Sequence, residues 1–286
     1  MSGILYVVAT PIGNLEDVTL RALRILRDVS LIAAEDTRRT GRLLQHYSIS
    51  TPTTSLHEHN ERQKTPSLIA RLQKGESIAL VSDAGTPLIS DPGQSLVSAA
   101  RDAGIRVESV PGPSAVMAAM ASAGFAGDGF TFAGFPPSRS KDRKTWLQRL
   151  SEDPRLVVFF EAPHRIQATL DDLQGILGPE QVVGIARELT KAHEELVIRP
   201  ISELRAYFHE PRGEFTVLIP VRKPRREHAE KPSKEQLAHE IGELTNSLRT
   251  SRREALRLVG AKYGIRPNEM YAMMADQHDK ETRRSH

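Results

Sequence analysis

Short apolar runs alternate along the first half of the chain with segments whose apolar residues recur at helical spacing. Leu68, Ile69 and Leu72 show that spacing most clearly, and Thr37 could cap a helix that runs to about His46. The apolar runs that predict strands span residues 5–9, 31–34, 78–81, 106–110 and 130–135. Strands that alternate with helices predict a largely parallel sheet with helices on both faces.

The second half has its own strand-like runs, and they lie closer together. They span residues 156–160, 182–186, 196–199 and 215–221, with helices expected at 165–177 and 201–208. Close spacing favours a mixed sheet, since antiparallel neighbours need only short connections. A polar, proline-bearing stretch from Pro136 to Lys141 separates the halves. We therefore predict one α/β domain at 1–136 and a second at 142–221.

The C-terminal segment is expected to be a small helical appendage at 234–286. Leu237, Ile241, Leu244 and Leu248 form an apolar stripe, and Ser251 precedes Glu254 as in a capping box. That helix should stop at Gly264, and Pro267 suits the start of the next. Two helices about a glycine-containing turn resemble a helix-turn-helix, although such hairpins often only pack.

Charge is unevenly distributed along the chain, which has a net charge of +3. From residue 222 to the end, 15 Lys and Arg accompany 10 Asp and Glu, a net of +5. A basic terminal segment indicates either a polyanion-binding element or a charged, solvated terminus.

Composition excludes several classes of site and protein. The chain has no Cys, so disulfides and thiolate chemistry are absent, which fits a reducing cytoplasm. No signal peptide or bilayer-length apolar run is present, so we expect a cytoplasmic protein without a membrane partner. A P-loop, a Gly-x-Gly-x-x-Gly turn and a Gly-x-Ser-x-Gly elbow are all missing. His57 and His59 resemble metal ligands but have no obvious third partner, so no metal is expected.

Three loops rich in Gly and Pro follow three of the predicted strands. They are Thr10 to Asn14, Ser82 to Gly93, and Val110 to Ser114. Open α/β sheets bind ligands at the carboxyl ends of their strands, so these loops should line one cleft. Since they carry few cationic anchors, backbone groups must do much of the binding. Such a cleft suits a zwitterionic ligand with adenine and ribose better than a triphosphate.

These loops, together with Glu35-Asp36-Thr37-Arg38, resemble the tetrapyrrole-methylase superfamily. The resemblance is closest to its branch of bacterial small-subunit ribosomal RNA methyltransferases. Further matching segments are 57–61, 132–136, 161–165, 186–191 and 213–215, so the resemblance covers nearly all of residues 4–220. Small-molecule branches typically have Gly-x-Gly-Pro-Gly-Asp at the first loop, where this chain has Thr-Pro-Ile-Gly-Asn.

The resemblance implies S-adenosylmethionine bound between two α/β domains, and 2′-O-methylation of a cytidine ribose in the decoding region of 16S rRNA. The implied partners are 16S rRNA and the small ribosomal subunit, and the implied assembly is a homodimer. The cofactor residues expected from it are Pro11, Asp83, Ala84, Gly85, Ser114, Ala115, Ala162 and Ala186.

A ribose hydroxyl is a poor nucleophile and benefits from a general base. The candidates selected as catalytic are Asp36, Glu61, Glu188 and Lys191, with His59 and Glu161 also considered. Each carboxylate near an arginine could instead be a structural ion pair. Arginines bind phosphate through bidentate contacts. The residues expected to contact RNA are Arg38, Arg39, His164, Arg165, Arg187, Arg249, Arg252, Arg253 and Arg257.

Two other functions stay compatible with these residues. One keeps the fold but methylates a carbon of a tetrapyrrole, because fold does not determine function. The other is a non-catalytic nucleic-acid-binding protein that uses the C-terminal hairpin.

Overall fold

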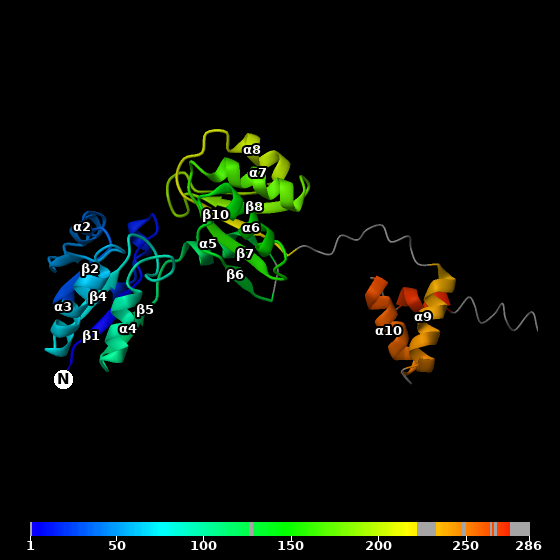
Figure 1. The fold of residues 1–286 in the computed structure, drawn as a ribbon, viewed down its shortest axis with the longest axis horizontal. Coiled ribbons are helices and arrows are strands. Elements are labelled where there is room, and N and C mark those ends of the chain that lie inside the picture. The colour runs from blue at the N-terminus through cyan, green and yellow to red at the C-terminus, as the bar shows by residue number, and fades with distance from the viewer. Residues whose placement is uncertain are drawn as a thin grey trace, which may run out of the picture. The chain divides into compact units, whose positions relative to one another are not determined.

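Two five-stranded sheets form residues 1–221, called the body here, in the computed structural model (Figure 1). Residues 222–286 form a separate unit, the tail. The structure describes residues 2–125, 128–221, 233–247, 250–263, 265 and 268–274. The predicted α/β class is confirmed.

The first sheet is entirely parallel, with strand order β3-β2-β4-β1-β5. Its strands are β1 (Ile4–Val8), β2 (Leu31–Ala34), β3 (Thr53–Ser55), β4 (Ile78–Val81) and β5 (Arg106–Val110). Every residue of β2 and β4 is buried, as expected for central strands covered on both faces. The strand β3 is not predicted by the apolar pattern, because Thr53, Thr54 and Ser55 include no apolar residue.

Helices cover both faces of this sheet (Figure 1). On one face, α1 (Leu20–Asp28) and α2 (Thr37–His46) pack against side chains such as Ile32. On the other face, α3 (Glu61–Gln73) and α4 (Gln94–Asp102) pack against the alternate side chains, such as Leu31. A short 3-10 turn, Leu15–Asp17, follows the first loop. With both faces covered, the strand ends are the place left for a ligand.

The second sheet is mixed, with strand order β6-β7-β10-β8-β9. Its strands are β6 (Phe130–Phe132), β7 (Leu156–Glu161), β8 (Val182–Arg187), β9 (Glu195–Pro200) and β10 (Phe215–Ile219). On one face lie α6 (Ser140–Leu150), α7 (Ile166–Leu177) and α8 (Ile201–Tyr207). On the other face lies α5 (Ala115–Ala123).

The boundary predicted at residue 136 is therefore wrong in one respect. The strand β6, assigned from sequence to the first domain, pairs in parallel with β7 of the second sheet. Helix α5 likewise packs on the second sheet. An apolar run predicts a strand but does not say which sheet it joins, so the pattern could not place β6.

The tail contains α9 (Lys234–Ser247), α10 (Arg252–Tyr263) and a helical segment at 268–274. Leu237, Ile241, Leu256, Val259 and Met270 belong to its small apolar core. The Ser251 hydroxyl accepts a hydrogen bond from the Glu254 amide at 3.3 Å, as the predicted cap requires. Leu248, Arg249, Gly264 and Pro267 lie outside the described residues. In the described residues, no helix combines the length and the apolar character that a bilayer span requires.

Candidate functional site

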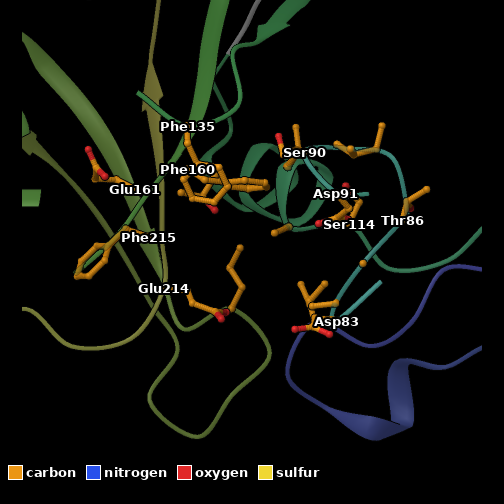
Figure 2. A pocket seen from close by; sticks show the side chains of 18 of the residues that line it. Asp83, Thr86, Ser90, Asp91, Ser114, Phe135, Phe160, Glu161, Glu214 and Phe215 are labelled. Carbon is orange, nitrogen blue, oxygen red and sulfur yellow. The ribbon is translucent and has the colours of Figure 1, made fainter. Parts of the chain in front are cut away.

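A cleft of about 450 Å³ lies between the loops of the first sheet and one end of the second sheet (Figure 2). In Figure 2, Asp83, Thr86, Asp91 and Ser114 face Phe135, Phe160 and Glu214 across it. The first group comes from loops after β4 and β5, and the second group comes from the second half of the body.

The three Gly/Pro loops meet at one edge of the first sheet, as their positions predicted. The Thr10 amide donates to the Gly85 carbonyl at 2.9 Å, and the Gly85 amide donates to the Thr10 carbonyl at 2.9 Å. Gly85 has a φ of +76°, a conformation that L side chains rarely adopt. The Thr86 hydroxyl lies 3.4 Å from the Pro113 carbonyl. These contacts hold the first loop against the second and the second against the third.

One end of the cleft is rich in carboxylates. Glu35, Asp83 and Asp91 all line it. The Asp83 carboxylate accepts the Asp36 amide at 2.9 Å, and Glu35 accepts the Asp83 amide at 3.3 Å. Burial raises the pKa of Asp91 to about 6, and burial together with the nearby Asp83 raises the pKa of Glu35. Crowded carboxylates favour a cation here.

The N-terminus of α5 supplies the opposite polarity. Ser114 caps this helix, accepting the Met117 amide at 3.4 Å, and Ala115 and Val116 follow it along the cleft wall. The first turn of a helix carries partial positive charge and unpaired amides, so it favours a carboxylate. The cleft therefore presents groups suited to both ends of a zwitterion.

Aromatic side chains form an apolar wall in the second half of the cleft. The rings of Phe135 and Phe160 have centroids 5.4 Å apart, and Phe135 is 54% exposed. Ile12 and Leu189 add further apolar surface. Small-molecule sites commonly combine an apolar surface with a few polar groups. The aromatic wall could pack against a flat ring system of a ligand.

Most of the predicted cofactor residues line this cleft. They are Asp83, Ala84, Gly85, Ser114, Ala115 and Ala162. Pro11 lines the neighbouring cavity instead, and Ala186 is fully buried in the core under α5. Glu35, Asp91, Phe135 and Phe160 were missed, although all lie in or beside the matching segments. Binding of cofactor by any of them stays a prediction.

Two of the predicted bases have structural roles. Asp36, rather than Thr37, caps α2 by accepting the Arg38 amide at 2.8 Å. Hydrogen bonds from Arg38 lower the pKa of Asp36 to about 2, which makes it a weak base. Glu61 is buried and accepts the amides of Ser95 at 2.6 Å and Leu96 at 3.3 Å, in the first turn of α4. Neither residue lines the cleft.

The other two predicted bases, Glu188 and Lys191, form an ion pair with each other. The Lys191 ammonium lies 2.8 Å from the Glu188 carboxylate and 3.0 Å from that of Glu214. Although burial opposes both shifts, this pairing lowers the pKa of Glu188 and raises that of Lys191. Lys191 therefore stays protonated near neutral pH. Among the other candidates, Glu161 is buried and bonded to Thr169, whereas His59 is exposed.

A second cavity of about 380 Å³ adjoins the cleft and shares Arg39, Asp83 and Glu214 with it. It is lined further by Thr10, Pro11, Leu15, Thr40, Arg42, Leu43, Ser82 and Lys191. Arg42 was not singled out from the sequence. Its position one helical turn after Arg38 and Arg39 places it on the same helix face, and that spacing could have identified it as a further cationic residue of the site.

The predicted RNA contacts differ in exposure, and some of them are already engaged within the body. Arg165 donates to the Pro137 carbonyl at 3.0 Å, and Arg187 pairs with Glu195 at 2.7 Å, so both serve the body's own packing. Arg38, Arg39 and His164 are exposed. In the tail, Arg252, Arg253 and Arg257 are exposed on α10, and Arg249 lies outside the described residues. The described residues contain no group of three His, Cys, Asp or Glu suited to a metal ion.

The chain is similar in sequence to known proteins over most of its length. It is 53% identical over 219 residues to "Ribosomal RNA small subunit methyltransferase I" of Synechocystis sp., covering 76% of this chain and 78% of that one. It is 43% identical over 279 residues to the protein of the same name in Escherichia coli O157:H7, covering 96% of each.

A solved structure shows the same fold. The uroporphyrin-III C-methyltransferase of Thermus thermophilus, complexed with S-adenosylhomocysteine, aligns with a TM-score of 0.55 and 18% identity, covering 77% of this chain and 98% of that one. The tetrapyrrole (corrin/porphyrin) methylase profile matches residues 4–205, a span that includes the whole first sheet, strands β6 to β9 of the second sheet and the three Gly/Pro loops of the cleft. With that match across the body and relatives of this identity, the chain belongs to the tetrapyrrole methylase family.

Proposed function

We propose that the protein transfers a methyl group from S-adenosylmethionine to the 2′-oxygen of a cytidine ribose in 16S rRNA of the small ribosomal subunit. The observation that carries this is the 43% identity, over 96% of both chains, to a protein named as a small-subunit ribosomal RNA methyltransferase. The tail is included in that alignment. A small-molecule enzyme would not need such a basic appendage.

The residues of the cleft fit S-adenosylmethionine. Its methionine end is a zwitterion with an additional sulfonium charge. The N-terminus of α5 at Ser114 suits the carboxylate, and the carboxylates of Glu35, Asp83 and Asp91 suit the positive charges. The wall of Phe135 and Phe160 suits the adenine ring.

The chemistry requires positioning above all. When bound, S-adenosylmethionine supplies a methyl carbon that bonds to the ribose oxygen as its bond to sulfur breaks, leaving S-adenosylhomocysteine and a proton. The loops hold the cleft in shape through the paired bonds between Thr10 and Gly85. We propose that Asp83 or Glu214 takes that proton, because these carboxylates line both cavities. Asp83 and Glu214 thus replace Asp36 and Glu61 as candidates for the general base.

The assembly we propose is a homodimer in the cytoplasm. Cyclic dimers are the commonest oligomers, and the body exposes large apolar side chains such as Leu20 and Met117. Light scattering at micromolar concentrations should give twice the chain mass. A monomeric mass throughout would exclude this assembly.

The proposed activity is tested with radiolabelled S-adenosylmethionine and three acceptors. These are small ribosomal subunits from a strain that lacks the gene, 16S rRNA transcribed in vitro, and a uroporphyrinogen. Label in the RNA, located at a cytidine 2′-oxygen by nuclease mapping, supports the proposal. Label in the porphyrinoid alone indicates a tetrapyrrole methylase. Binding of RNA without binding of cofactor indicates a non-catalytic protein.

A further inference from the structure

The second cavity differs in character from the cleft beside it. Its wall on one side is α2, which brings Arg39 and Arg42, and its wall on the other side brings Lys191. Its volume of about 380 Å³ lies within the usual range of small-ligand sites, roughly 300–1,000 Å³. Three cationic side chains around one cavity indicate an anionic occupant.

The three cations are not equally engaged. Lys191 is held between Glu188 and Glu214, and Arg39 lies 3.4 Å from Asp83. Arg42 is exposed, and no ion pair is found for it among the described residues. An anion entering the cavity would therefore meet an uncompensated charge at α2. The carboxylates of Asp83 and Glu214, on the side shared with the cleft, would repel it from there.

Polarity therefore changes along the path from α2 to the cleft. Arg42 lines only the second cavity, whereas the carboxylates of Asp83 and Glu214 lie on the side shared with the cleft. A ribonucleotide has matching polarity, because its phosphate is an anion and its ribose hydroxyl is the group to be deprotonated. Single-stranded RNA can present such a nucleotide splayed out of its stack.

We propose that this second cavity holds the RNA nucleotide to be methylated, with a flanking phosphate on Arg42. This rests on the proposed function and names its substrate site. Arg42 is here a binding residue, and the ribose lies between it and the carboxylates of Asp83 and Glu214. The cavity thus separates substrate from cofactor, and the two meet only at the shared residues.

The test compares two arginines of the body by the salt dependence of RNA affinity. Arg42→Gln removes the proposed phosphate contact, and Arg42→Lys keeps its charge. Arg62→Gln is the matched control, because Arg62 is an exposed arginine near the start of α3, on the opposite face of the sheet. Affinity for 16S rRNA is measured by filter binding from about 50 to 300 mM KCl, and cofactor affinity by calorimetry.

We expect Arg42→Gln to lower RNA affinity severalfold and to reduce the slope of log affinity against log salt by about 0.7–0.9. Arg42→Lys should keep the slope, Arg62→Gln should match the unaltered protein, and cofactor affinity should be unchanged in all. Equal slopes for Arg42→Gln and Arg62→Gln would overturn the assignment. Failure of the unaltered protein to methylate any RNA would instead refute the proposed function, and the two failures are distinct.

Discussion

The guanidinium of Arg39 lies 3.4 Å from the carboxylate of Asp83, and both residues line the cleft and the second cavity. Arg39 comes from α2 and Asp83 from the loop after β4, so the pair stands where the two cavities join. Arg39 is largely exposed, and exposed ion pairs contribute only about 0–1 kcal/mol. Arg39 can therefore leave Asp83 at little cost when a phosphate approaches.

Asp83→Asn tests the carboxylate end of the cleft. The amide oxygen can still accept the Asp36 amide, now 2.9 Å from the Asp83 carboxylate, so the loop should keep its shape. Loss of the charge should weaken S-adenosylmethionine binding severalfold, because the ligand is cationic at that end. Calorimetry measures the affinity, with Asp17→Asn at an exposed position as the control. Unchanged affinity in a folded variant would remove Asp83 from the cofactor site.

Asp91 should make stability depend on pH. Burial raises its pKa from 3.8 to about 6, so the folded state binds this proton more tightly than the unfolded state. The contribution of Asp91 to stability is therefore present below about pH 4 and is lost as pH rises through about 6.

Asp91→Asn removes that penalty, since the amide does not ionise. The variant should melt at a higher temperature than the unaltered protein at pH 7.5, and the difference should shrink towards pH 4.5. Thermal unfolding followed by circular dichroism at both pH values measures this. A difference that is the same at both values would mean that the Asp91 carboxyl titrates normally.

Much of the body could be predicted because its strands are buried on both faces. The runs at 31–34 and 78–81 coincide with β2 and β4, since central parallel strands are continuous apolar stretches in the sequence. The run at 106–110 coincides with β5, although this edge strand is only partly buried. The strand β3 could not be predicted from Thr53, Thr54 and Ser55, because only its pairing with β2 makes it a strand. The sheet that β6 joins is likewise decided by tertiary contacts.

The site was predicted in outline but not in its chemistry. Gly/Pro loops at strand ends located the cleft, since that argument depends only on topology. The roles of Asp36 and Glu61 could not be read from the sequence. A carboxylate in a loop can equally be a base or a helix cap. Which role it has depends on whether backbone amides of a helix lie within hydrogen-bonding distance of it. For Glu61, those amides lie 34 and 35 residues further along the chain.

Glu61→Ala separates these two roles. Loss of the bonds to the amides of Ser95 and Leu96 should lower the free energy of unfolding by about 1–2 kcal/mol, as for other lost helix caps. Glu61→Gln keeps an acceptor oxygen and should lower it less. Urea unfolding gives both values, while cofactor affinity stays unchanged. A fall of about 100-fold or more in the single-turnover rate of folded Glu61→Ala would instead restore Glu61 as a base.

The tail should dock RNA independently of the cofactor site. Arg253 and Arg257 lie four residues apart on α10, so they share one face of it, and both are exposed, as is Arg252. The body has its own two sheets and cores, so a chain ending at residue 222 should fold and bind S-adenosylmethionine with unchanged affinity. Its methylation of 16S rRNA should be poor, because it lacks the basic surface.

Single substitutions make this prediction specific. Replacing Arg252, Arg253 or Arg257 by Gln should each reduce the slope of log RNA affinity against log salt by about 0.7–0.9 if that residue contacts a phosphate. Arg62→Gln in the body serves as the control, as before. The tail core is formed on α10 by buried residues such as Leu256 and Val259. The three arginines are exposed, so replacing them should not disturb that packing. Full methylation efficiency by the truncated chain at every salt concentration would assign RNA binding to the body alone, and Arg42 would then be its first candidate.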